Sequence, residues 1–95
     1  MKTPKDYTLK YQGTNPLEKL HDGEPYFFIR AQDKLSPMAV AKYADLLKEE
    51  SEKASGAGNT ELADNLVKQA LGVLRVVNIF HDWQDANQSL VKLPD

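Results

Sequence analysis

Residues 60–87 read TELADNLVKQALGVLRVVNIFHDWQDAN and decide the fold. Apolar side chains recur along this stretch at the i, i+3, i+4 spacing of one helical face. Between residues 71 and 80 only a glycine, an arginine and an asparagine interrupt the apolar run. The pattern predicts one long helix over residues 60–87 that is buried on most sides. Its main stripe comprises Leu62, Leu66, Ala70, Val73 and Val77, and Val67, Leu71 and Leu74 widen it.

This helix is long for a chain of 95 residues. At 1.5 Å per residue it spans roughly 40 Å, whereas a compact domain of this size has a radius of gyration of roughly 12–13 Å. Either the helix bends near Gly72, or a second subunit covers its apolar surface. We expect a homo-oligomer, of which a dimer is the commonest form. Residues 76–80 also fit a strand, but no turn signal precedes them, so a helix is favoured.

A shorter amphipathic helix is predicted over residues 36–54. Ser36 is the expected N-cap, and Pro37 then occupies the first helical position, where a missing N–H costs nothing. The sequence SGAG at residues 55–58 ends this helix and links it to the next, for which Asn59 or Thr60 is a suitable cap. The apolar face of the shorter helix comprises Val40, Tyr43, Ala44 and Leu47.

The remaining segments predict a small sheet. Residues 1–25 are polar and rich in turn residues, which indicates an extended N-terminal arm. Residues 26–33 are aromatic and β-branched and predict a strand, and residues 89–93 predict a short strand beside it. The expected fold is therefore α+β, in a single domain over residues 1–95, with a small antiparallel sheet packed on two antiparallel helices. The second of these helices is long and is expected to form the oligomer.

The predicted strand carries the candidate ligand site on one of its faces. Alternate side chains of a strand point to opposite sides, so Phe27, Ile29 and Ala31 are expected to face the core. The opposite face combines aromatic rings, which stack on flat ligands, with a guanidinium that forks onto phosphate or carboxylate. This face and the residue after it give five candidate ligand-binding residues, which are Tyr26, Phe28, Arg30, Gln32 and Asp33.

An alternative for this strand is purely structural. Tyr26 and Phe28 would then pack under the long helix, while Arg30 would pair with Asp33 or Glu24. Aromatic residues of a small sheet belong more often to the core than to a ligand site.

The end of the long helix is a candidate surface for a protein partner. Trp83 is the only tryptophan, and exposed Trp residues often anchor interfaces; equally, Trp83 could cover the edge of the core. His81 beside it suits the negative end of a helix dipole. With Asp82 it invites a metal interpretation, but two histidines far apart in the sequence make a poor ligand set.

Composition excludes several classes of protein. The chain has no cysteine, so disulfides and thiolate chemistry are absent. Twelve Lys+Arg against 14 Asp+Glu give a net charge of −2, which argues against a general nucleic-acid binder. No secretory signal or membrane-spanning run is visible, so the cytoplasm is the expected location. No catalytic residue, cofactor or metal is predicted. A third hypothesis is a weak enzyme that would use His81 and Asp85, one helical turn apart.

Three short segments carry a resemblance to known proteins. EPYFFIRAQD at residues 24–33, the Ser36-Pro37 helix start and KLPD at residues 92–95 resemble a group of small proteins of tailed phages and prophages to which no activity is assigned. The resemblance implies a context in which such proteins are often inhibitors, adaptors or sponges for a host signalling nucleotide. We expect a non-catalytic, homo-oligomeric protein that sequesters a nucleotide-like signal in counter-defence. The alternative is an inhibitor or adaptor that acts on a host protein.

Overall fold

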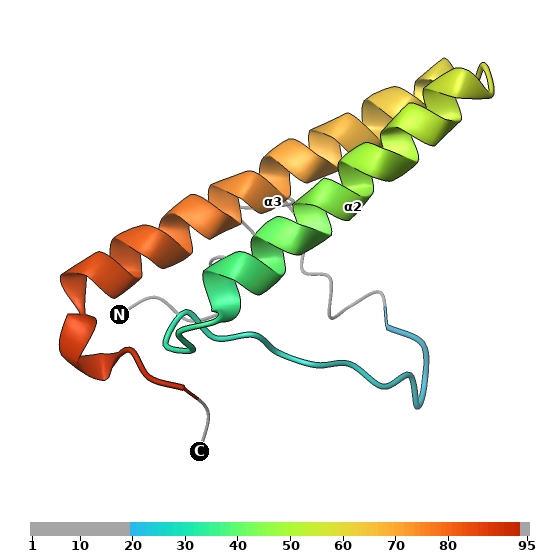
Figure 1. Cartoon of the computed structure of the whole chain (residues 1–95). Coiled ribbons are helices and arrows are strands. Elements are labelled where there is room, and N and C mark those ends of the chain that lie inside the picture. The colour runs from blue at the N-terminus through green and yellow to red at the C-terminus, as the bar shows by residue number, and fades with distance from the viewer. Residues whose placement is uncertain (1–19, 94–95) are drawn as a thin grey trace.

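The computed structural model describes residues 20–93, and its main feature is a hairpin of two antiparallel helices (Figure 1). Helix α2 spans Ser36–Gly56, helix α3 spans Thr60–Ala86, and a short 3-10 helix, η2, spans Gln88–Leu90. The helices expected at residues 36–54 and 60–87 are thus present, with ends that differ by one or two residues. Residues 76–80 belong to α3, as favoured.

The expected α+β fold is wrong, because the described residues contain no strand. Residues 26–29 lie in an extended segment, but no hydrogen bond joins their backbone to another described residue. The second expected strand, at residues 89–93, is replaced by η2 and a single parallel bridge between Asp33 and Lys92. A strand needs a neighbour along its length, whereas each helix here satisfies its own backbone and packs on the other. Of the arm expected at residues 1–25, residues 1–19 lie outside the described part.

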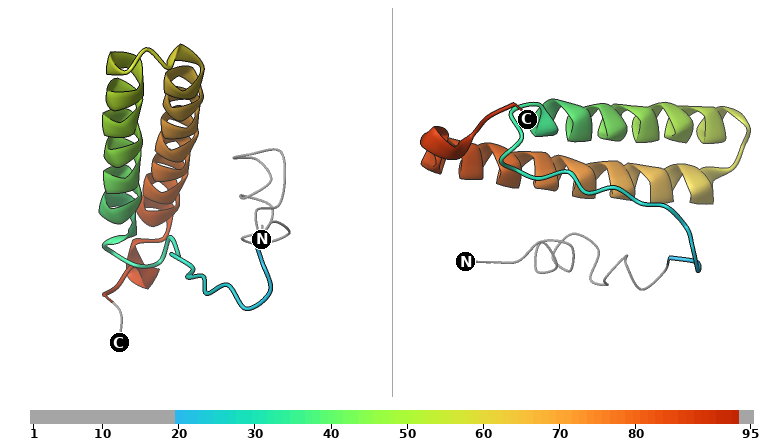
Figure 2. Two further views of the ribbon diagram at one scale, coloured as in Figure 1. Left: turned by 90° about the vertical axis from the view of Figure 1, so that its right-hand side faces the viewer. Right: turned by 90° about the horizontal axis from the view of Figure 1, so that it is seen from below.

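Small side chains form the contact between α2 and α3. Most of the buried positions are three, four or seven residues apart, which places them on one face of each helix. The two helices lie side by side along the hairpin (Figure 2). Ser51 is buried in this contact, and its Oγ donates to the Ala63 carbonyl at 2.8 Å. Four of the seven buried apolar residues are alanine, which lets the backbones approach closely but buries little apolar area. These seven are Ala44, Leu47, Ala54, Ala63, Ala70, Val73 and Val77.

The start of α2 differs from the prediction. Ser36 is the first residue of the helix rather than its N-cap, and the N-cap, Leu35, makes no side-chain capping bond. The carboxylate of Asp33 supplies a side-chain hydrogen bond at this helix start: its Oδ1 accepts from the Leu35 N–H at 2.8 Å. Ser36 is buried and its Oγ donates back to the Asp33 carbonyl at 2.8 Å. At α3, Asn59 is the N-cap of the two candidates, Asn59 and Thr60: its Oδ1 accepts from the Leu62 N–H at 3.2 Å.

Two expectations about the core are also wrong for the described chain. Phe27, assigned to the core face of a strand, is 84% exposed, because no sheet is present to cover it. Helix α3 is not buried on most sides: Leu71 is 51% exposed, and Leu62 and Val67 are also exposed. The helix runs through Gly72 without interruption, and the radius of gyration of 15.1 Å exceeds that of a compact chain of this length. Helix α3 is therefore continuous through Gly72, and part of its apolar surface is exposed in the described chain.

Candidate functional site

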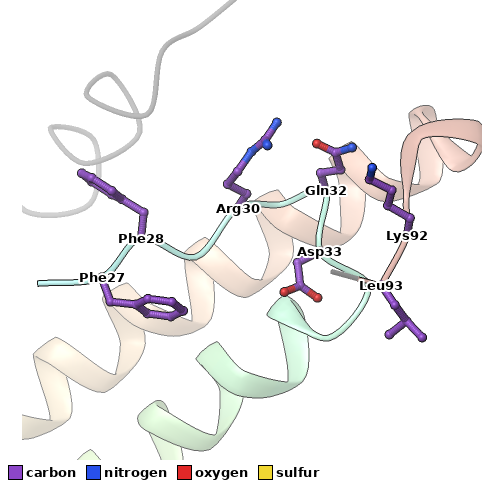
Figure 3. Close-up of a pocket in the computed structure, with 7 residues that line it drawn as sticks. All are labelled: Phe27, Phe28, Arg30, Gln32, Asp33, Lys92 and Leu93. Atoms are coloured by element: carbon purple, nitrogen blue, oxygen red, sulfur yellow. The ribbon is translucent and has the colours of Figure 1, made fainter. Parts of the chain in front are cut away.

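An open cavity of about 390 Å³ lies at the end of the hairpin where α2 begins (Figure 3). It brings together two segments that are far apart in the sequence, the extended chain before α2 and the residues after η2. Four of the five candidate ligand residues line it: Phe28, Arg30, Gln32 and Asp33. The remaining lining residues are Phe27, Lys92 and Leu93.

The side chains along the cavity follow an extended chain. Phe28, Arg30 and Gln32 project to one side of the segment, and Lys92 lies beside Gln32 on that side (Figure 3). Phe27 and Asp33 project to the other side. The alternation inferred from sequence therefore holds for these residues without a sheet. It sets an aromatic ring, a guanidinium and an amide in a row along one side of the segment.

The polar end of the cavity is held by a dense set of hydrogen bonds. Each of the four consecutive carbonyl groups of residues 30–33 accepts at least one. Arg30 O accepts from the Asp33 N–H at 3.0 Å, and Gln32 O accepts from the Lys92 N–H at 3.1 Å. Ala31 O accepts from Gln84 Nε2 at 2.8 Å. Asp33 O accepts from Gln84 Nε2 at 3.0 Å and from both the N–H and the Oγ of Ser36.

Lys92 reaches the cavity because η2 turns the chain back at the end of α3. Asn87 Nδ2 donates to the Trp83 carbonyl at 2.9 Å, and the Leu90 N–H donates to the Asn87 carbonyl at 2.8 Å. The returning chain then forms the parallel bridge, in which the Lys34 N–H donates to the Lys92 carbonyl at 2.9 Å. The 3-10 turn thus carries Lys92 and Leu93 to the edge of the cavity.

The aromatic end has no comparable support. Tyr26 and Phe28 contact each other edge to face, with ring centroids 5.3 Å apart, and both rings are exposed. Tyr26 itself does not line the cavity. The site therefore has a polar end fixed by hydrogen bonds and an aromatic end that no described backbone bond restrains.

The charges of the cavity favour a ligand that is anionic and that also carries hydrogen-bond donor groups. Two cationic side chains, Arg30 and Lys92, line it together with one carboxylate, Asp33. Arg30 is exposed, and among the described residues it forms no ion pair, so the alternative pairing with Asp33 or Glu24 is not found. An exposed guanidinium of this kind can form two parallel hydrogen bonds to a phosphate or carboxylate. The Asp33 carboxylate can accept a hydrogen bond from a hydroxyl or amino group.

The other candidate residues lie outside this cavity. Trp83 is half-buried and His81 is exposed, both in the last two turns of α3, and neither lines the cavity. Sequence reasoning missed Phe27, Lys92 and Leu93. Phe27 was assigned to a core that is absent, whereas Lys92 and Leu93 belong to the KLPD segment, whose place next to residues 32–34 depends on η2.

Among residues 20–93, no group of three or more His, Asp or Glu side chains is arranged to hold a metal ion. Within the same part of the chain, no helix has the length and apolar character needed to cross a membrane.

Comparison with known proteins adds no relative. No protein-family model, no curated protein and no solved structure matches the chain.

Proposed function

We propose that the protein is a non-catalytic binding protein for a small, nucleotide-like anion. The observation that carries this proposal is the cavity in which exposed aromatic rings, Arg30 and Asp33 lie together. Its volume of about 390 Å³ lies within the range of small-molecule sites. A nucleotide offers a partner for each of these groups: a flat base for the rings, a phosphate for the guanidinium and ribose hydroxyls for the carboxylate.

The phage resemblance supports a role in sequestration. A protein that binds a signalling nucleotide without converting it lowers the free concentration of the signal by mass action. The proposed setting is the cytoplasm of a host cell, where the protein would act in counter-defence. Binding alone is sufficient for this role, and the proposal assigns no bond-breaking step to any residue.

We further propose that the protein acts as a homo-oligomer. The hairpin buries seven apolar residues in the described chain, four of them alanine, which is a small core for an independently stable fold. Large apolar residues remain exposed on both helices, including Tyr43 and Leu46 on α2 and Leu71 on α3. A second copy would cover such surfaces, as helical bundles do.

The first test is native mass spectrometry of the protein purified from cells. We expect a multimer that carries a small additional mass, released on denaturation and identified as a nucleotide by its fragmentation. The Arg30→Ala variant should keep the same multimer and lose the additional mass, because the guanidinium no longer holds the anion. Lys34→Ala is the matched control: Lys34 is an exposed cation nearby that does not line the cavity.

Two outcomes would contradict the proposal. If the additional mass remains bound to Arg30→Ala, the ligand sits elsewhere. If the multimer is empty and nucleotides added at millimolar concentration do not bind, the ligand function fails. Capture of a host protein that survives Arg30→Ala but is lost with Trp83→Ala would then support the alternative of a protein-binding inhibitor.

A further inference from the structure

Helix α3 continues well past the beginning of α2. The hydrogen bond from Ser51 to Ala63 aligns the two helices. Counting fifteen residues back along α2 and forward along α3 from this pair places Ser36 opposite Asn78. The remaining residues of α3, up to Ala86, are about two turns with no partner on α2. Figure 1 shows this overhang at the end of the hairpin from which η2 departs.

Gln84 lies on the overhang, and its side chain binds the turn that carries the site. Its Nε2 donates to Ala31 O at 2.8 Å and to Asp33 O at 3.0 Å, so both N–H bonds of the amide are used. These two carbonyls flank Gln32, a residue that lines the cavity. The bonds span more than fifty residues of sequence. They link α3 directly to the site turn through one side chain.

The same turn is the fixed part of the cavity. Gln84 binds the carbonyl of Ala31. The carbonyl of the next residue, Gln32, accepts from the Lys92 N–H in the parallel bridge. If the turn moved, the bridge and the spacing between Arg30 and Lys92 would change with it.

We infer that Gln84 is a positioning residue of the binding site: its amide fixes the turn of residues 30–33 on the end of α3 and thereby sets the arrangement of Arg30, Gln32 and Lys92. The inference that these residues bind a ligand rests on the proposed function. The positioning itself rests on the hydrogen bonds and can be tested without a ligand.

The test uses Gln84→Glu in the full chain. The introduced carboxylate is nearly isosteric with the amide but cannot donate to the two carbonyls. We expect hydrogen–deuterium exchange, followed by NMR, to show that the protection of the Lys34 and Lys92 amides falls by about tenfold or more at neutral pH. The amides in the middle of α2 and α3 should keep their protection, because they lie far from position 84.

A pH series separates positioning from a general loss of stability. When the introduced carboxyl is protonated, it regains one donor. Protection of the Lys34 and Lys92 amides in Gln84→Glu should therefore recover in part below about pH 5. The control is Gln88→Glu, which makes the same change on an exposed residue of η2. It should match the wild type at each pH.

The outcomes distinguish this inference from the proposed function. Unchanged protection of Lys34 and Lys92 in Gln84→Glu would overturn the positioning role, and so would an equal loss of protection along both helices. ADP, titrated by NMR, is the probe for the ligand arm: binding to the wild type and to Gln88→Glu, but about tenfold weaker binding to Gln84→Glu, supports the role. Failure of the wild type to bind ADP would count against the proposed ligand, while the exchange result would still decide the role of Gln84.

Discussion

At the scale of single residues, Asp33 combines two roles that can be separated. Its Oδ1 accepts from the Leu35 N–H at 2.8 Å, which fixes the entry to α2. Its carboxylate also lines the cavity, on the opposite side of the segment from the Arg30 side chain. The hydrogen bond needs only an oxygen acceptor, whereas discrimination between ligands depends on the charge.

The variant Asp33→Asn should keep the first role and remove the second. Asparagine offers the same acceptor oxygen, so the free energy of unfolding should change by less than about 0.5 kcal/mol. Pyrophosphate, a probe with charge and no base or ribose, should bind more tightly by about 0.2–1 kcal/mol, because a repulsive charge is gone. Calorimetry measures both quantities.

The comparison variant is Asp33→Ala, which loses the acceptor as well. It should lower the free energy of unfolding by about 1 kcal/mol, the usual cost of a lost helix-start bond. Weaker binding of pyrophosphate by Asp33→Asn, or equal stability of both variants, would show that the two roles are assigned wrongly.

At the scale of elements, the hairpin depends on small side chains where the helices are closest. Ala44 and Ala70 have no exposed surface, and both belong to the buried cluster. The Ser51 hydroxyl also lies in this contact and donates a hydrogen bond to a backbone carbonyl of the opposite helix. A larger side chain here has no free space to enter.

The variant Ala44→Leu should therefore destabilise the hairpin by about 1–3 kcal/mol, the usual cost of overpacking a well-filled contact. Thermal unfolding followed by circular dichroism measures this change. The control is Ala39→Leu, the same substitution on the same helix at an exposed position, and it should leave the melting temperature nearly unchanged. A stable Ala44→Leu variant would indicate that the helices separate easily and that the small-residue contact does not fix their distance.

The sequence predicted these elements unequally, for a physical reason. Both helices could be located, because a helix closes its hydrogen bonds within its own segment and its spacing is visible in the sequence. The strand predicted at residues 26–33 is wrong for the described chain, since a strand exists only beside a neighbouring strand, and alternation alone does not show whether one is present. The same local alternation did predict that Phe28, Arg30 and Gln32 share one side.

Site residues from distant segments were beyond this kind of reasoning. The place of Lys92 in the cavity depends on where α3 ends and on how η2 turns the chain. The role that we infer for Gln84 depends on how far α3 extends past the start of α2. No motif in the sequence marks either residue. Phe27 was misassigned because its burial was inferred from a sheet that the described residues do not form.

At the scale of the whole molecule, the uncovered apolar surface is the feature that still needs an explanation. Helix α3 buries one apolar face against α2, but Val67 and Leu71, on the same helix, remain exposed. Contiguous apolar surface of this kind marks an interface more often than a free surface in a folded protein. A second copy would bury the flank of α3 and enlarge the small core of the hairpin at the same time.

The variant Leu71→Glu tests this surface, because glutamate is a good helix former but costs free energy when it is buried in an interface without a partner. We expect the mass measured by light scattering to fall from that of a multimer to that of a monomer of 10.7 kDa.

Leu90→Glu is the matched control, since Leu71 and Leu90 are both 51% exposed but Leu90 lies on η2. If exposure alone favoured association, both variants would dissociate alike; if α3 forms the interface, the Leu90→Glu variant stays multimeric. A wild-type protein that is already a monomer at micromolar concentration would contradict the proposed oligomer, and a multimeric Leu71→Glu variant would place the interface on another face.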